Sequence, residues 1–161
     1  MRKIIMLLSL SLALQFTLGA PDLTFAAGWS SDRPAAKQVD PDLDRADKAI
    51  KAKEYDRAIG LLNAVVARDE RNAEAHNLLG YAERLRGNLD AAFKHYERAL
   101  ALDPKHRGAH EYIGETYLLA GNLPKAEEHL AILDKLCFWP CEEYSDLKAA
   151  VKAYKEKQPR Q

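Results

Sequence analysis

Two cysteines near the C-terminus are the residues whose chemistry is most evident in this sequence. They enclose the segment Cys137-Phe-Trp-Pro-Cys141, and Pro140 prevents a helix from continuing through it, so the two thiols flank a corner of the chain. The spacing differs from that of Cys-x-x-Cys oxidoreductases, and His129 is the one evident additional ligand nearby. We expect a structural disulfide between Cys137 and Cys141; the alternatives are two free structural thiols and a redox- or metal-linked accessory protein that uses the same pair.

The histidines are candidate ligands for a metal ion. His76 and His110 lie 34 residues apart, but a zinc site needs three or four ligands that converge. We interpret these two rings as packing between helices, and His95, His106 and His129 as solvated. The sequence contains no evident nucleophile–base set, phosphate-binding loop or pair of catalytic carboxylates. It therefore predicts no metal, no cofactor and no enzymatic activity.

Composition and the first residues indicate an exported protein without net charge. The 161 residues include 24 basic and 24 acidic side chains, which gives no field to attract nucleic acid or an anionic membrane. Arg2 and Lys3 precede an uncharged run of 15 residues, Ile4–Leu18, shorter than the roughly 20 that a membrane helix needs. The pattern predicts a signal peptide over 1–26, cleaved near Ala26. The mature protein is then periplasmic or secreted, with no nucleic-acid partner and no membrane insertion after cleavage.

The remainder of the chain has a helical period and an internal repeat. From Asp42 onward, apolar residues recur at helical spacing between short polar breaks. Displacing the chain by 34 residues places Gly80 on Gly114 and Ala92 on Ala126, small residues that would let neighbouring helix backbones approach closely. We expect a flexible linker, a degenerate first repeat, two further repeats and a turn with a capping helix, with the bounds 27–40, 41–72, 73–106, 107–136 and 137–158.

The segment 73–104 resembles the tetratricopeptide repeat family. The positions that carry the resemblance are occupied by Leu79, Gly80, Ala92, Tyr96, Ala99 and Pro104. The resemblance implies an all-α fold, a right-handed superhelical stack of about three helix-turn-helix repeats with a C-terminal capping helix. It also implies a concave groove, lined by the first helix of each repeat, that binds a peptide or helix of another protein.

Carried over by spacing, the groove residues are Asp47, Lys51, Asn77, Tyr81, Arg84, Glu111, Glu115 and Leu118. This lining is mixed to acidic, whereas family members that grip the acidic C-terminus of a chaperone carry Lys, Asn and Arg at several of these places. We therefore expect a guest with basic and apolar character. The expected protein is a non-catalytic interaction module, such as an assembly or scaffolding factor of an envelope complex, and a monomer or weak homodimer.

Overall fold

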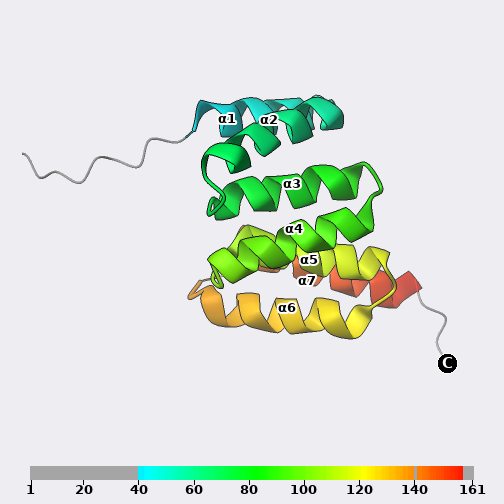
Figure 1. Cartoon of the computed structure of the whole chain (residues 1–161). Helices are drawn as coiled ribbons and strands as arrows, with labels where there is room; N and C mark the ends of the chain where they lie inside the picture. Colours follow the sequence, from blue (N-terminus) through cyan, green and yellow to red (C-terminus); the bar gives the residue numbers. More distant parts are fainter. Residues whose placement is uncertain (1–39, 140, 158–161) are drawn as a thin grey trace, which may run out of the picture. The chain divides into compact units, whose positions relative to one another are not determined.

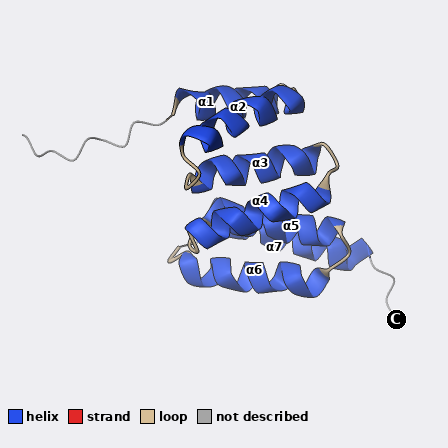
Figure 2. Ribbon diagram, in the orientation of Figure 1, coloured by secondary structure: helices blue, strands red, loops and turns tan. Residues whose placement is uncertain are grey.

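Three antiparallel helix hairpins and one further helix make up the fold. The structure, a computed structural model, describes residues 40–139 and 141–157, and in these ranges the chain forms seven α-helices and no strand. Figures 1 and 2 show the hairpins α1/α2, α3/α4 and α5/α6 stacked one on the next. The all-α repeat stack predicted from the sequence is confirmed. The helices are α1 (Pro41–Lys51), α2 (Tyr55–Arg68), α3 (Ala73–Leu85), α4 (Leu89–Leu102), α5 (Arg107–Leu119), α6 (Leu123–Leu136) and α7 (Glu142–Lys157).

The first helix of each hairpin contacts the first helix of the next. Helix α1 contacts α3, and α3 contacts α5. Helix α7 packs against both α5 and α6, so it lies where the first helix of a fourth repeat would lie. Four helices, α1, α3, α5 and α7, therefore form one continuous inner face of the stack.

Small residues recur at buried positions between helices, as the repeat predicts. Gly80 and Gly114 are buried. Their neighbours are side chains and not the backbones expected: a Cβ at Gly80 would lie 2.6 Å from Tyr96 Cε1, and one at Gly114 would lie 2.6 Å from Leu147 Cδ2. The glycines thus make room for large side chains of the adjacent helix. The equivalent small residues of the second helices, Ala92 and Ala126, are fully buried.

Each hairpin turns through one residue with a positive φ. Gly87 and Gly121 have φ angles of 88° and 77°, in the left-handed region that glycine tolerates best. The next residue caps the second helix, as Asn88 does by accepting a hydrogen bond from the backbone N–H of Ala91. In the first hairpin the turn position is Lys53, whose φ is 61°.

Replacing Lys53 by glycine is expected to raise the free energy of unfolding by about 1 kcal/mol. A left-handed conformation costs an L-residue roughly 1–2 kcal/mol, and the larger entropy of glycine in the unfolded chain offsets part of the gain. Urea denaturation at pH 7 measures the change. The control is Lys94→Gly on an exposed turn of α4, which should lose about 1 kcal/mol; destabilisation by both substitutions would contradict the prediction.

Four histidines form two pairs, each between the two helices of one hairpin. His76 Nδ1 lies 3.4 Å from His95 Nδ1, and His110 Nδ1 lies 2.9 Å from His129 Nδ1. His76 and His110 are buried between helices, as expected. The interpretation of His95 and His129 as solvated is wrong, because each ring is partly buried against its partner. Burial lowers the pKa of all four rings, and that of His129 to about 4.

The His110–His129 pair makes the fold sensitive to acid. A histidine whose pKa is lowered by folding stabilises the protein above its unfolded value of 6.5, and this stability is lost as the pH falls towards the folded value. At pH 5 the stability lost through protonation of His129 is at most about 2 kcal/mol. We expect a loss of about 1 kcal/mol because the ring is only partly buried. Between pH 7.5 and 5, the wild type should lose about 1 kcal/mol more than His129→Gln. Urea denaturation of both proteins measures this difference. Other titrating groups contribute equally to the loss in each protein and therefore cancel. Identical losses in the two proteins would contradict the prediction.

The cysteine corner joins α6 to α7. The Sγ atoms of Cys137 and Cys141 lie at disulfide distance, with the Cα atoms 5.8 Å apart, a geometry that agrees with the disulfide predicted from the sequence. Phe138 and Trp139, between the cysteines, are 94% and 77% exposed.

The signal peptide predicted over 1–26 and the linker up to residue 39 lie outside the described residues. Within the described ranges, no helix combines the length and apolar character needed to cross a membrane.

Candidate functional site: an acidic cleft on the inner face

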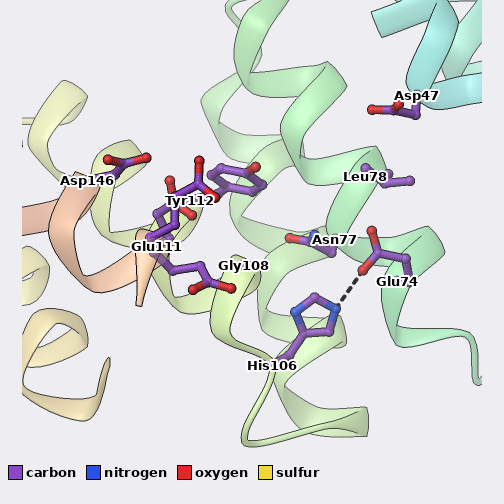
Figure 3. Close-up of a pocket in the computed structure, with 11 residues that line it drawn as sticks. Asp47, Glu74, Asn77, Leu78, His106, Gly108, Glu111, Tyr112 and Asp146 are labelled. Carbon is purple, nitrogen blue, oxygen red and sulfur yellow. Dashed lines mark hydrogen bonds and ion pairs between the residues drawn. The ribbon is translucent and has the colours of Figure 1, made fainter. Parts of the chain in front are cut away.

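A cleft of about 410 Å³ opens on the inner face of the stack. We call it the acidic cleft, because six of its eleven lining residues are Asp or Glu and none is Lys or Arg. Figure 3 shows Asp47 and Asp146 on opposite sides, with Asn77 and Glu111 between them. The lining comes from α1, α3, α5, α7 and the turn before α5: Asp47, Glu74, Asn77, Leu78, His106, Gly108, Glu111, Tyr112, Glu142, Glu143 and Asp146.

Basic side chains contact half of these acidic residues. Lys51 bonds Asp47 at 2.6 Å, and Arg107 Nε lies 3.4 Å from Glu143 Oε1. His106 Nε2 lies 2.9 Å from Glu74 Oε2, the contact that Figure 3 marks with a dashed line. The remaining three acids have no basic partner among the residues described: Glu111, Glu142 and Asp146.

His106 links the turn before α5 to α3. Its side chain is only 14% exposed, so the interpretation of this residue as solvated is wrong. Its Nδ1 accepts a hydrogen bond from the backbone N–H of Ala109 and caps α5, and the bond to Glu74 raises its pKa. An Nδ1 that accepts from Ala109 carries no proton, so in this geometry the ring is neutral and its Nε2–H donates to Glu74 Oε2. His106 carries a positive charge only at a pH low enough to protonate Nδ1, at the expense of the cap on α5.

Glu111 is the most enclosed of the six acids. It is 8% exposed, and burial raises its pKa from 4.5 to about 8, with further increases from the charges of Glu115, Asp146 and Glu143. The guanidinium of Arg84 opposes this shift only weakly. At pH 7 most Glu111 side chains therefore hold a proton. A cation bound in the cleft would lower the pKa of Glu111 and favour its ionised form.

Asn77 presents an unused acceptor to the same cleft. The residue is 3% exposed, and its Oδ1 finds no hydrogen-bond partner among the described residues. Figure 3 shows the oxygen end directed across the cleft, towards the side that holds Glu111. A Cβ at position 108 would lie 3.4 Å from Asn77 Nδ2, so Gly108 leaves the amide room. A buried acceptor without a partner costs free energy, which a donor from a bound molecule would recover.

The Arg84 side chain interacts with other residues of the protein, in a cluster beside the cleft. It forms an ion pair with Glu115 at 2.9 Å, and its guanidinium carbon lies 5.1 Å and 5.7 Å from the ring centres of Tyr81 and Tyr112. The two rings stack with their centres 4.6 Å apart. Because these residues come from α3 and α5, the cluster ties the second repeat to the third. Tyr112 also lines the cleft and links the two groups.

The residues proposed for the groove thus fall into four environments. Asp47, Asn77 and Glu111 line the cleft. Tyr81, Arg84 and Glu115 form the adjoining cluster, and Lys51 lies one helical turn beyond Asp47, to which it is bonded. Leu118 does not line the cleft, because its side chain packs into a core cluster with Leu133, Leu147 and Val151.

Sequence reasoning missed the carboxylates of α7, because that helix was interpreted only as a cap. Helix α7 begins 35 residues after α5, as α5 begins 34 residues after α3. A continued repeat period would therefore have placed Glu142, Glu143 and Asp146 on the inner face. The other residues missed lie on α3 and α5 or in the turn between repeats: Glu74, Leu78, His106, Gly108 and Tyr112.

Metal chemistry gains no support from the geometry. No group of three or more His, Cys, Asp or Glu side chains in the described ranges is arranged to hold a metal ion. His129, the additional ligand considered for the cysteine pair, lies against His110 instead.

Two models of the tetratricopeptide repeat match the sequence, one over residues 43–106 and the other over residues 84–136. Together they span the three hairpins from α1 to α6. The chain belongs to the tetratricopeptide repeat family. A comparison with curated protein sequences gives no match.

Several solved structures share the fold. The type III secretion translocator chaperone SycD of Yersinia enterocolitica is 22% identical, with a TM-score of 0.65, covering 73% of this chain and 83% of that chain. PcrH in complex with the chaperone binding region of PopD is 18% identical, with a TM-score of 0.64, covering 73% and 90%. The second repeat domain of Spaghetti (RPAP3), bound to the HSP90 peptide SRMEEVD, is 24% identical, with a TM-score of 0.57, covering 60% and 90%. At these identities the similarity establishes the fold alone.

Proposed function

We propose that this protein is a non-catalytic interaction module that binds an extended or helical segment of a partner protein in the acidic cleft. The observation that carries the proposal is the cleft itself, built from the first helices of successive repeats and α7 and lined by six acidic residues without Lys or Arg. Within the described ranges, Glu142 and Asp146 carry unpaired charges, and Glu111 can ionise when a cation binds. Its leucine and tyrosine add apolar surface. A guest with basic and apolar side chains fits this lining because opposite charges attract across an interface.

Structural neighbours support a peptide-binding role. SycD has been solved with a peptide of the translocator YopD, and PcrH with the chaperone binding region of PopD. The HSP90 peptide bound by RPAP3, SRMEEVD, has three acidic residues and one basic residue. The acidic cleft would repel such a peptide, so the proposed guest differs in charge.

The proposal extends to the cellular setting. The signal-peptide pattern of residues 1–26 supports a periplasmic or secreted protein, and an assembly or scaffolding role in an envelope complex follows from export combined with peptide binding. In that compartment Cys137 and Cys141 would be oxidised, and the disulfide would fix the angle between α6 and α7. Since α7 supplies three of the cleft carboxylates, this angle shapes the site.

Charge reversal at the two sides of the cleft tests the function. Peptides selected on the wild-type protein from a random library should be enriched in Lys or Arg together with apolar residues. The double variant Asp47→Lys/Asp146→Lys should bind them roughly tenfold or more weakly, because like charges would then face each other, as measured by fluorescence anisotropy.

The matched control carries the same charge change outside the cleft. Glu97→Lys/Asp134→Lys alters exposed positions of α4 and α6, neither of which lines the cleft, and its affinity should remain within about twofold of the wild type. Selection of acidic peptides, or equal binding by both double variants, would refute the proposed function.

A further inference from the structure

The inner wall of the acidic cleft combines two features that a bound cation would satisfy together. Asn77 on α3 offers a buried Oδ1 without a partner in the described part of the chain. Glu111 on α5 faces the same space and is 8% exposed. The acceptor and the acid belong to different repeats, so their shared opening is a property of the stack and not of one helix.

We propose that this inner wall is a subsite for one lysine or arginine side chain of the bound segment, held by Asn77 Oδ1 and the Glu111 carboxylate. This inference rests on the proposed function and names the group that the cleft selects. The head group of Lys or Arg carries several N–H donors and a positive charge. It can therefore donate to the amide oxygen and pair with the carboxylate at once, which a neutral side chain cannot do.

Occupation of the subsite is coupled to a proton on Glu111. In the free protein, burial and neighbouring acids raise the pKa of Glu111 to about 8, so the side chain is mostly neutral at pH 7. An incoming cation favours the ionised form and expels the proton. Between the bound and free pKa values, affinity then rises by up to tenfold for each pH unit.

Other titrating groups around Glu111 must be separated from it. Glu115 on α5 and Glu143 and Asp146 on α7 are acids that raise its pKa, and Arg84 on α3 is the opposing cation. At the far end of the cleft, His106 bonds Glu74 and would also favour cation binding as it loses its charge. Only Glu111, however, is removed by Glu111→Gln, which resembles the protonated acid in shape and should leave the fold intact.

Calorimetry with an arginine probe tests the subsite. We would titrate the pentapeptide acetyl-Leu-Arg-Leu-Arg-Leu-amide, and its lysine analogue, into the wild-type protein between pH 6 and pH 7.5 in two buffers of different ionisation enthalpy. We expect the dissociation constant to fall several-fold over this range, with net release of protons. Glu111→Gln should weaken binding at pH 7.5 and abolish both the pH dependence and the proton release, and Asn77→Leu should weaken binding while retaining the pH dependence. Glu97→Gln, on α4, should match the wild type.

The outcomes separate this subsite from the general function. Peptides that bind in the cleft, as judged by Asp47→Lys/Asp146→Lys, but whose affinity is unchanged in Glu111→Gln and Asn77→Leu would overturn the subsite and leave the proposed function standing. A pH dependence that persists in Glu111→Gln would also overturn it and assign the effect to His106. Failure of both pentapeptides to bind at millimolar concentration overturns the subsite. The proposed peptide-binding function is tested separately, by the selection from the random library.

Discussion

Leu147→Ala is expected to lower the free energy of unfolding by about 2–5 kcal/mol, the cost of truncating a fully buried leucine. The side chain has no exposed surface, lies over Gly114 of α5, and packs with Leu118 and Leu133. Its removal leaves a cavity where α7 docks on the third repeat, so α7 should lose much of its attachment. Chemical denaturation followed by circular dichroism measures the loss.

A matched substitution separates burial from the chemical change. Leu119→Ala deletes the same atoms from a leucine that is 62% exposed at the end of α5, and its cost should stay below about 1 kcal/mol. Equal losses in the two variants would show that Leu147 is not packed as described. Because α7 supplies Glu142, Glu143 and Asp146 to the cleft, peptide binding should also weaken in Leu147→Ala and not in Leu119→Ala.

Gly80→Val is expected to destabilise the protein by about 3 kcal/mol, at the upper end of the range for an overpacked core. The new Cβ would lie 2.6–2.9 Å from three atoms of the Tyr96 ring, and because that ring is fully buried, moving it would displace other core side chains. Helix propensity favours valine over glycine by only a few tenths of a kcal/mol, so the steric effect decides the sign. Thermal and urea denaturation measure the change.

Gly60 provides the control for this substitution. It is also a helical glycine, but a Cβ built there meets nothing within 4 Å. Gly60→Val should therefore be neutral or slightly stabilising. If Gly80→Val were as well tolerated as Gly60→Val, the close packing of the second repeat would be refuted.

The repeat period predicted the elements of the fold that depend on local sequence. Buried Gly80 and Gly114, and the left-handed turns at Gly87 and Gly121, follow from residue type and spacing alone. Lys53 broke the glycine pattern, although the structure gives it the same backbone conformation. The backbone N–H groups of Lys53 and Glu54 donate to the carbonyls of Ile50 and Ala49, the same pattern that closes the turn at Gly87. These hydrogen bonds hold a backbone angle that lysine itself disfavours.

The site could be predicted only in part, because convergence of side chains depends on how repeats stack. Asp47, Asn77 and Glu111 follow from their places on the first helices. The Glu74–His106 contact, by contrast, joins residues 32 apart, and the sequence does not reveal which rotamers bring them together. Leu118 illustrates the opposite error, since helical spacing alone does not distinguish an inner face from the seam where α7 docks.

The two sides of the cleft come from opposite ends of the repeat array, α1 and α7. Linear arrays lose structure most readily at their terminal units, because each of these has only one neighbour. A ligand that contacts both α1 and α7 would stabilise these terminal helices by its binding free energy. Recognition and resistance to terminal fraying would then be a single property of this protein.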